Sequence, residues 1–263
     1  MIVNEQAIGI FDSGIGGLSI ARQIHQLLPS ENLLYVADTI HAPYGEKSTE
    51  YITQRAFEIC EFLIQRNVKA IVVACNTATV SSIKALRAKY TIPIIGVEPG
   101  VKPAVFNTKS GIVGVLATAQ TLKSASFNDL AKAFSTNVKI EVQPCPGLME
   151  QVEALSLDSA STEALIKQYV FPLLEKGADH IVLGCTHYAF LAPMIKKIVG
   201  PNIEIVNTDF AVAKETARRL DILNLRSTHV GQGHVEFWSS APADIAHKQF
   251  SMLWGESVTV FKI

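Results

Sequence analysis

The sequence predicts an α/β protein with two pseudo-symmetric lobes, each a mostly parallel sheet flanked by helices. Short apolar strands alternate with amphipathic helical stretches along all 263 residues. This alternation is typical of a parallel sheet covered by helices on both faces. A single core rarely exceeds about 200 residues, so the length favours two domains. Matched segments in the two halves of the chain favour a duplication of one plan.

The predicted strands are short runs rich in β-branched residues, and helical stretches separate nearly all of them. They cover residues 7–12, 33–38, 69–75, 92–97, 111–117, 138–143, 179–185 and 203–207. One predicted helix, 17–28, carries its apolar residues on one face, and another, 209–223, opens on Asp209 as an N-cap. The C-terminal stretch from residue 234 is predicted as strand, helix, strand, with Trp238 and Trp254 in packing roles.

Three segments recur in register between the two halves. GIFDS (9–13) aligns with GVLAT (114–118), IVVAC (71–75) with IVLGC (181–185), and IPIIGVE (92–98) with IEIVNTD (203–209). The offset grows smoothly along the chain, as a duplication with small insertions predicts.

The duplication predicts how the chain divides. We expect residues 1–97, completed by 210–263, to form a first lobe that carries Cys75. Residues 98–209 would form a second lobe that carries Cys185. Ligands of open α/β sheets bind beyond the carboxyl ends of the strands. The active site is therefore expected between the lobes.

The composition excludes several classes of protein. A formal net charge of −1 without a block of Lys and Arg argues against nucleic-acid and membrane-surface binding. No apolar run approaches the roughly 20 residues that span a bilayer. Residues 1–10 lack the basic start and apolar stretch of a secretory signal. We expect a cytoplasmic protein without disulfides that acts on a small molecule.

The four cysteines differ in their settings. Cys60 recurs with Phe57 and Ile64 at helical spacing and is predicted to be a core residue. Cys145, between two prolines, has no assigned role. No CxxC motif is present, and only Cys185 and His187 approach metal-ligand spacing, so no metal site is expected.

Cys75 and Cys185 end matched predicted strands and so could approach one ligand from opposite sides. Racemisation needs a base on one face of a carbon and an acid on the other, with the roles exchanged in reverse. Thiol and thiolate suit both roles. Asn76-Thr77 and Thr186-His187 follow the two cysteines and could hold a carboxylate. The plainer interpretation is that both cysteines are small buried residues that close a strand.

Five motifs carry a family resemblance over essentially the whole chain. They are FDSGIGGLS (11–19), ADTIHAPYGEKS (37–48), VVACNTAT (72–79), GVEPGVKPA (96–104) and LGCTHY (183–188). With them the sequence resembles the glutamate racemases of the aspartate/glutamate racemase family, bacterial enzymes that interconvert L- and D-glutamate without a cofactor and supply D-glutamate for peptidoglycan.

The resemblance implies roles for particular residues. Cys75 would be the base for D-glutamate and Cys185 the base for L-glutamate, with Asp12 and His187 as auxiliary acid/base or orienting groups. The substrate-binding residues that it implies are Asp12, Ser13, Pro43, Tyr44, Gly45, Asn76, Thr77, Thr118, Glu150, Thr186 and His187. It implies no cofactor and no metal, and the chain could form a homodimer.

The sequence departs from the family pattern in two places. Ala189 stands where proline commonly follows GCTHY, and we expect only a local change in how the next helix begins. The sequence also lacks the N-terminal extension of the members that a cell-wall precursor activates, which puts such activation in doubt.

Several site residues have simpler interpretations. Asp12 could be only a helix N-cap, His187 a loop histidine, and Tyr44-Gly45 a turn. Glu150 could be a solvated charge on a surface helix.

Three other functions compete with this interpretation. GIGGLS (14–19), with Asp38 about 20 residues on, has the skeleton of a dinucleotide-binding fingerprint, but Ser19 stands where that motif has Gly or Ala. A racemase for aspartate or another small acid would share the two thiols. A two-lobed binding module without catalysis is disfavoured by the missing signal sequence.

Overall fold

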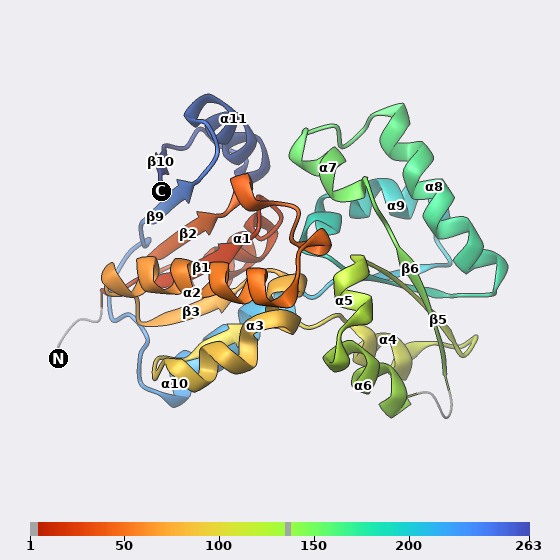
Figure 1. Cartoon of the computed structure of the whole chain (residues 1–263), viewed down its shortest axis with the longest axis horizontal. Helices are drawn as coiled ribbons and strands as arrows, with labels where there is room; N and C mark the ends of the chain where they lie inside the picture. The colour runs from red at the N-terminus through yellow and green to blue at the C-terminus, as the bar shows by residue number, and fades with distance from the viewer. Residues whose placement is uncertain (1–4, 135–137) are drawn as a thin grey trace. The chain divides into compact units, whose positions relative to one another are not determined.

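The computed structural model describes residues 5–134 and 138–263. The chain splits into two compact units, one of Met1–Val97 with Asp209–Ile263 and the other of Glu98–Thr208. In Figure 1 the first unit comprises the red-to-yellow N-terminal segments and the blue C-terminal segments, and the second is mainly green to cyan.

The first unit is built on a six-stranded sheet with the order β10-β9-β2-β1-β3-β4. Neighbouring strands of this sheet pair in parallel, so the carboxyl ends of the strands meet at one edge. The strands are β1 (Ile8–Asp12), β2 (Leu33–Ala37), β3 (Ala70–Val73), β4 (Ile94–Gly96), β9 (Val235–Ser239) and β10 (Val260–Lys262). The helices are α1 (Leu18–Leu27), α2 (Thr49–Gln65), α3 (Asn76–Lys89), α10 (Asp209–Ile222) and α11 (Ala243–Trp254), with short 3₁₀ turns η1 (Thr39–His41) and η2 (Tyr44–Glu46).

Alternation along the strands divides the core of this unit into two layers. Phe11, Val36 and Val73 join a buried cluster with apolar residues of α2 and α3. The neighbouring residue Tyr35 points the other way, where its ring lies 5.7 Å from that of Phe250 in α11. Helices α2 and α3 thus cover one face, while α1, α10 and α11 pack together on the other.

The second unit is built on a four-stranded sheet with the order β6-β5-β7-β8, also parallel. Its strands are β5 (Ile112–Ala117), β6 (Lys139–Pro144), β7 (His180–Gly184) and β8 (Glu204–Val206). Its helices are α4 (Val101–Asn107), α5 (Ala119–Lys123), α6 (Ala125–Phe134), α7 (Leu148–Glu153), α8 (Ala160–Glu175) and α9 (Ala192–Val199), with a 3₁₀ segment η3 (Thr186–Leu191). Val113, Val115 and Ala117 pack against α4 and α6. On the other face α8 comes so close that a Cβ on Gly114 would lie 2.9 Å from Leu173.

The two sheets share one strand order. The run β2-β1-β3-β4 in the first unit corresponds to β6-β5-β7-β8 in the second. The sequence repeat pairs β1 with β5, β3 with β7 and β4 with β8, and these strands occupy equivalent places in the two sheets. The predicted fold class, parallel sheets flanked by helices, is confirmed. It follows that the two cysteines come after equivalent strands. Cys185 directly follows β7, and one residue separates Cys75 from the end of β3.

All eight predicted strands of the repeat are present, and the C-terminal strand, helix and strand are present as well. The strand predicted at 69–75 is shorter in the structure, where β3 ends at Val73 because Cys75 already serves as the N-cap of α3. Asp209 is the first residue of α10, with its side chain hydrogen-bonded to Ser19. Both tryptophans pack as predicted. The Trp238 ring lies 5.2 Å from that of Phe62, and the Trp254 ring lies 5.0 Å from that of Phe237.

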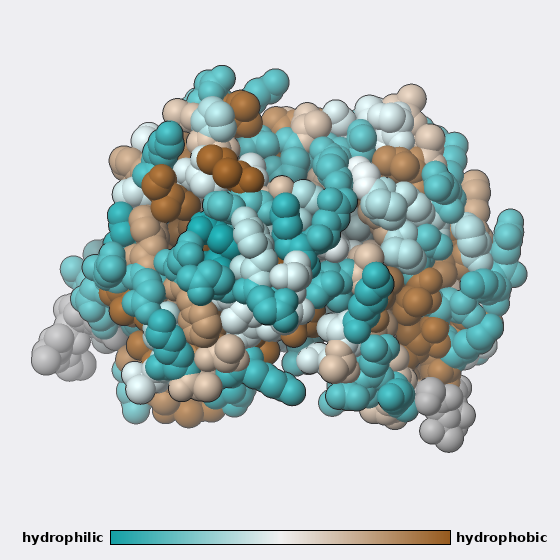
Figure 2. All heavy atoms as spheres, in the orientation of Figure 1, coloured by the Kyte–Doolittle hydropathy of each residue, from teal (hydrophilic) through white to brown (hydrophobic). Residues whose placement is uncertain are grey.

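Within residues 5–134 and 138–263, no helix is long and apolar enough to cross a bilayer. Figure 2 shows a face that is mostly hydrophilic, on which the apolar residues form separate patches with polar side chains between them.

Cys60 tests the core of the first unit. It is fully buried in the cluster beneath α2, and burial raises the pKa of its thiol to about 12. We expect Cys60→Ala to lower the free energy of unfolding by about 1–3 kcal/mol, because it leaves a small cavity. Urea denaturation of the two proteins measures this difference. An unchanged midpoint would show that the site collapses around the smaller side chain or is not packed as described.

Candidate functional site

Cys75 lies where β3 gives way to α3. As the N-cap residue of α3, it accepts the backbone N–H of Ala78 on Sγ at 3.4 Å, and its thiol lies 3.7 Å from Oγ of Ser13. The residue is only 5% exposed. Because the N-terminus of a helix carries partial positive charge, this position favours the thiolate form.

The residue after Cys75 has an unused hydrogen-bond donor. Asn76 begins α3 and is buried, and no group in the described part of the chain accepts a hydrogen bond from its Nδ2. Leaving such a donor unpaired costs about 1–3 kcal/mol. An acceptor on a bound molecule would recover that cost. Thr77 is buried beside it.

Asp12 ends β1 and is fully buried. Its carboxylate accepts the backbone N–H groups of Ser13, at 2.5 Å, and of Gly17, which is the N-cap residue of α1. The capping interpretation of Asp12 therefore has support. A Cβ on Gly17 would lie 2.9 Å from the Cβ atoms of both Asp12 and Ala74, so only glycine allows the loop to approach so closely. This approach fixes Asp12 next to the residue that precedes Cys75.

Tyr44 belongs to the short turn η2, which follows Pro43, and its side chain is buried in the same core cluster as Cys75. Its hydroxyl donates to Oδ2 of Asp38 at 2.6 Å. Burial and then the Asp38 carboxylate raise the pKa of Tyr44 well above its usual value. The turn interpretation is correct for the backbone, and the ring adds a buried contact that the sequence did not predict.

Cys185 follows β7 and is 8% exposed. Cys75 is followed at once by an α-helix, whereas Cys185 is not. The segment after Cys185 is the 3₁₀ turn η3, and α9 begins only at Ala192, where Pro193 favours a helix start. The Cys185 side chain does not cap η3.

A histidine takes the supporting place at Cys185 instead. His187 Nδ1 lies 3.8 Å from the Cys185 sulfur, and His187 Nε2 lies 2.7 Å from Oε1 of Glu153 in α7. Burial alone would lower the pKa of His187, but its hydrogen bonds to Cys185 and Glu153 outweigh burial and raise that pKa well above its usual value. The arrangement suits an imidazolium between a thiolate and a carboxylate.

The contact of Glu153 with His187 is not predicted from the sequence. The family resemblance points to Glu150 in the same helix, which is exposed in the structure, whereas Glu153 is largely buried and contacts His187. A helical wheel over Leu148–Glu153 would have shown both acidic residues, but nothing in the sequence shows which one faces His187.

Thr118 and Thr186 lie beyond the carboxyl ends of two strands in the second unit, β5 and β7. Thr118 follows β5 and caps α5 through its hydroxyl, which accepts the Thr121 N–H at 3.2 Å. Thr186 is buried at the start of η3. The structure thus gathers Asp12, Ser13, Pro43, Tyr44, Gly45, Cys75, Asn76 and Thr77 in the first unit. It places Thr118, Glu150, Cys185, Thr186 and His187 in the second.

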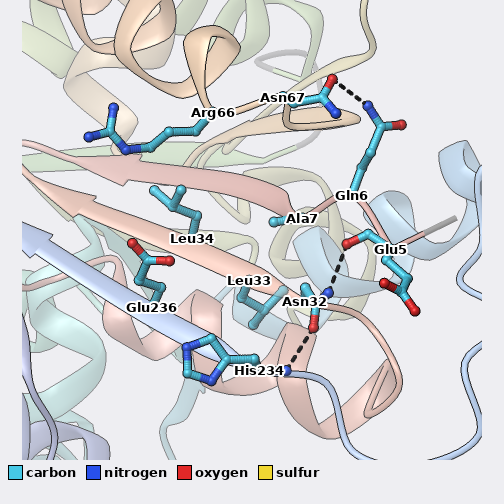
Figure 3. A pocket seen from close by; sticks show the side chains of 10 residues that line it. All are labelled: Glu5, Gln6, Ala7, Asn32, Leu33, Leu34, Arg66, Asn67, His234 and Glu236. Atoms are coloured by element: carbon cyan, nitrogen blue, oxygen red, sulfur yellow. Dashed lines mark hydrogen bonds between the residues drawn. The ribbon is translucent and has the colours of Figure 1, made fainter.

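A pocket of about 630 Å³ lies elsewhere in the first unit. Figure 3 shows that it opens beside the starts of β1 and β2. Cys75 lies instead beyond the carboxyl end of β3. The lining residues of the pocket are Glu5, Gln6, Ala7, Asn32, Leu33, Leu34, Arg66, Asn67, His234 and Glu236. No residue predicted for the site lines it.

Comparison with known proteins shows the family to which the chain belongs. The profile of the Asp/Glu/Hydantoin racemase family matches residues 8–215, and the chain belongs to this family of isomerases. The predicted resemblance is confirmed.

The matches extend to named proteins over nearly the whole chain. The chain is 52% identical to a glutamate racemase from Methylococcus capsulatus over 254 residues, which are 97% of this chain and 94% of that one. Its fold is similar to that of glutamate racemase isoform RacE1 from Bacillus anthracis, with a TM-score of 0.90, 32% identity, and coverage of 99% and 98%. It is also similar to Escherichia coli glutamate racemase in complex with L-glutamate and the activator UDP-MurNAc-ala, with a TM-score of 0.86, 31% identity, and coverage of 98% and 97%.

The contact between His187 and Glu153 can be tested directly. We expect Glu153→Gln to lower the pKa of His187, because it removes one of the charges that favour the imidazolium. NMR titration of the ring nitrogens measures this pKa. An unchanged titration would show that Glu153 does not act on His187.

The same contact predicts how stability depends on pH. The folded-state pKa of His187 is raised, so its contribution to stability is complete below the unfolded pKa of about 6.5 and is lost as pH rises through the folded-state pKa. In Glu153→Gln that loss should occur at lower pH. Urea denaturation from pH 6 upward checks the sign.

Proposed function

We propose that this protein racemises glutamate without a cofactor, with Cys75 and Cys185 acting on opposite faces of the α-carbon. One observation carries the proposal above the others. Two buried thiols follow equivalent strands of two parallel sheets, and four strands of the first sheet have the same order as the four strands of the second. The names of the relatives specify glutamate as the substrate.

The proposed reaction moves two protons. The Cys75 thiolate removes the α-proton of D-glutamate, and the electron pair of the C–H bond passes to the α-carbon and into the carboxylate. The Cys185 thiol then delivers its proton to the other face and becomes a thiolate. The product is L-glutamate, and the reverse reaction begins from the Cys185 thiolate. Each turnover therefore needs both sulfurs in opposite protonation states.

Each unit supports its thiolate by different means. The N-terminus of α3 and the Ala78 N–H stabilise negative charge on Cys75. The His187 imidazolium, held by Glu153, stabilises negative charge on Cys185. We propose that Asp12 orients the loop beside Cys75 and that His187 assists Cys185.

The substrate carboxylates would be held by hydroxyl, amide and backbone donors. The unpaired Nδ2 of Asn76 is a ready donor in the first unit. The other proposed contacts are Ser13, Pro43, Tyr44, Gly45, Thr77, Thr118, Thr186 and His187. Charge-assisted hydrogen bonds to a carboxylate strengthen as charge accumulates on it while the α-proton leaves. The role of Glu150 in substrate binding stays a prediction. Its side chain is exposed in the structure, and no contact of it supports that role.

One competing function loses support from the geometry. In a dinucleotide site the acidic residue after the second strand would bind a ribose hydroxyl. Here both oxygens of Asp38 are already engaged by Arg55, and Tyr44 donates to one of them. A racemase for aspartate or another small acid remains the alternative.

We further propose that the D-glutamate supplies peptidoglycan synthesis and that the protein works in the cytoplasm, in which case its partner is a small molecule rather than nucleic acid or membrane. Both points follow from the family resemblance. A homodimer is compatible with this role.

Incubation with single amino acids tests the proposed function. L-glutamate alone should lose its optical rotation over time, and D-glutamate should do the same from the opposite sign. Racemisation of aspartate but not glutamate would support the alternative. Activity that requires a nicotinamide nucleotide, or no turnover at all, would contradict the proposal.

The two thiols can be tested separately. We expect Cys75→Ala and Cys185→Ala each to abolish racemisation, because each turnover uses both sulfurs. Cys60→Ala is the matched control, since it removes a buried thiol that lies in the core and should keep turnover per folded molecule. Polarimetry measures all three. Near-normal racemisation by either of the first two variants would contradict the two-base mechanism.

A further inference from the structure

A partly buried ion pair between Arg55 and Asp38 contacts the proposed substrate-binding turn of the first unit through Tyr44. Arg55 in α2 donates from Nε to Oδ2 of Asp38 at 2.9 Å and from Nη2 to Oδ1 at 2.7 Å. Asp38 is fully buried, while the Arg55 side chain is 19% exposed. Such a two-pronged contact fixes orientation as well as charge.

The pair continues to Tyr44 and to the Cys75 region. Tyr44 donates to the same Oδ2 at 2.6 Å, and its ring shares a core cluster with Cys75. The backbone N–H of Asp38 donates to the carbonyl oxygen of Asp12 at 3.0 Å. Asp38 is thus hydrogen-bonded to Tyr44 and to Asp12, which are both proposed site residues.

The charges around Cys75 have opposing effects. Asp12 from β1 and Asp38 after β2 are buried carboxylates, and negative charge near a thiol disfavours its thiolate. Asp12 is compensated by the N–H groups of its loop. Asp38 is compensated by Arg55, which also contacts Glu58 on its outer side. Tyr44, from η2, keeps its proton because of burial and Asp38.

We propose that Arg55 is a positioning residue for the reaction at Cys75: it neutralises Asp38, and through Asp38 it holds Tyr44 and its turn in place. Arg55 touches no reacting atom in this account. Its effect reaches the site through a carboxylate that would otherwise oppose the Cys75 thiolate.

Among the described residues of the second unit, no such pair is found at the equivalent place. Ala37 pairs with Asp12 and precedes Asp38, while Pro144 pairs with Ala117 and precedes Cys145. Cys145 therefore stands where the first unit has Asp38, and burial keeps the pKa of its thiol high. The Arg55–Asp38 pair is therefore a feature of the surroundings of Cys75, and Cys185 can serve as an internal reference in a test.

Alkylation of the full chain by iodoacetamide between pH 6 and 10, with each cysteine peptide quantified by mass spectrometry, tests the proposal. Arg55→Gln should slow alkylation of Cys75 about tenfold at pH 7, because Asp38 is left uncompensated. Asp38→Asn should speed it, because the Arg55 cation remains. The double variant should return toward wild type. The pH profile of Cys185 should not move in any of them.

Two further variants separate charge from folding. Arg55→Lys keeps the charge and should hold the Cys75 profile close to wild type. Arg218→Gln is the matched control. Arg218 also donates two hydrogen bonds to one carboxylate, that of Glu215, but this pair lies on the exposed surface of α10. This substitution should change neither cysteine.

The proposal is overturned if Arg55→Gln and Asp38→Asn shift the Cys75 profile in the same direction, or if neither shifts it. It rests on the proposed role of Cys75 as an acid/base group. Because alkylation reads the thiolate without any substrate, its failure is distinguishable from a failure of glutamate racemisation.

Discussion

The parallel arrangement of each sheet is the constraint on which the site depends. Because the strands of a parallel sheet all point the same way, their carboxyl ends and the N-termini of the following helices share one edge. This geometry brings to one edge three residues that lie at or just beyond the ends of three different strands of the first unit, namely Asp12, Asp38 and Cys75. Antiparallel pairing of any one strand would move its terminal residue to the opposite edge.

The duplicated plan produces two thiols in equivalent places, but their surroundings have diverged. In the first unit the N-terminus of α3 lies at Cys75, and Arg55 pairs with the buried carboxylate of Asp38, which Tyr44 also contacts. In the second unit a histidine held by Glu153 supports Cys185. A two-base racemase needs each sulfur to accept and to donate a proton. Different supports can meet the same requirement, so strict symmetry of the side chains is unnecessary.

Features set by local pattern could be predicted from the sequence. The strands, most of the helices and the repeat follow from apolar periodicity and from matched segments such as IVVAC and IVLGC. The class of protein followed from motifs, and the family match confirms it.

Contacts between segments distant in the chain could not be predicted in the same way. Glu153 approaches His187 over 34 positions, and Arg55 approaches Asp38 over 17. Both depend on which face of a helix packs inward and on the exact path of a loop. The 3₁₀ turn after Cys185 could not be predicted for a related reason. Its sequence is also compatible with an α-helix, and in the structure α9 begins only after this turn.

The central claim is that the two sulfurs act on opposite faces of one carbon. A crystal structure of the protein with D-glutamate bound tests it most directly. The account predicts that the Cys75 and Cys185 sulfurs lie on opposite sides of the α-carbon, each within reach of the proton that it removes or delivers. Glutamate bound with both sulfurs on one side, or with either sulfur turned away from the α-carbon, would contradict it.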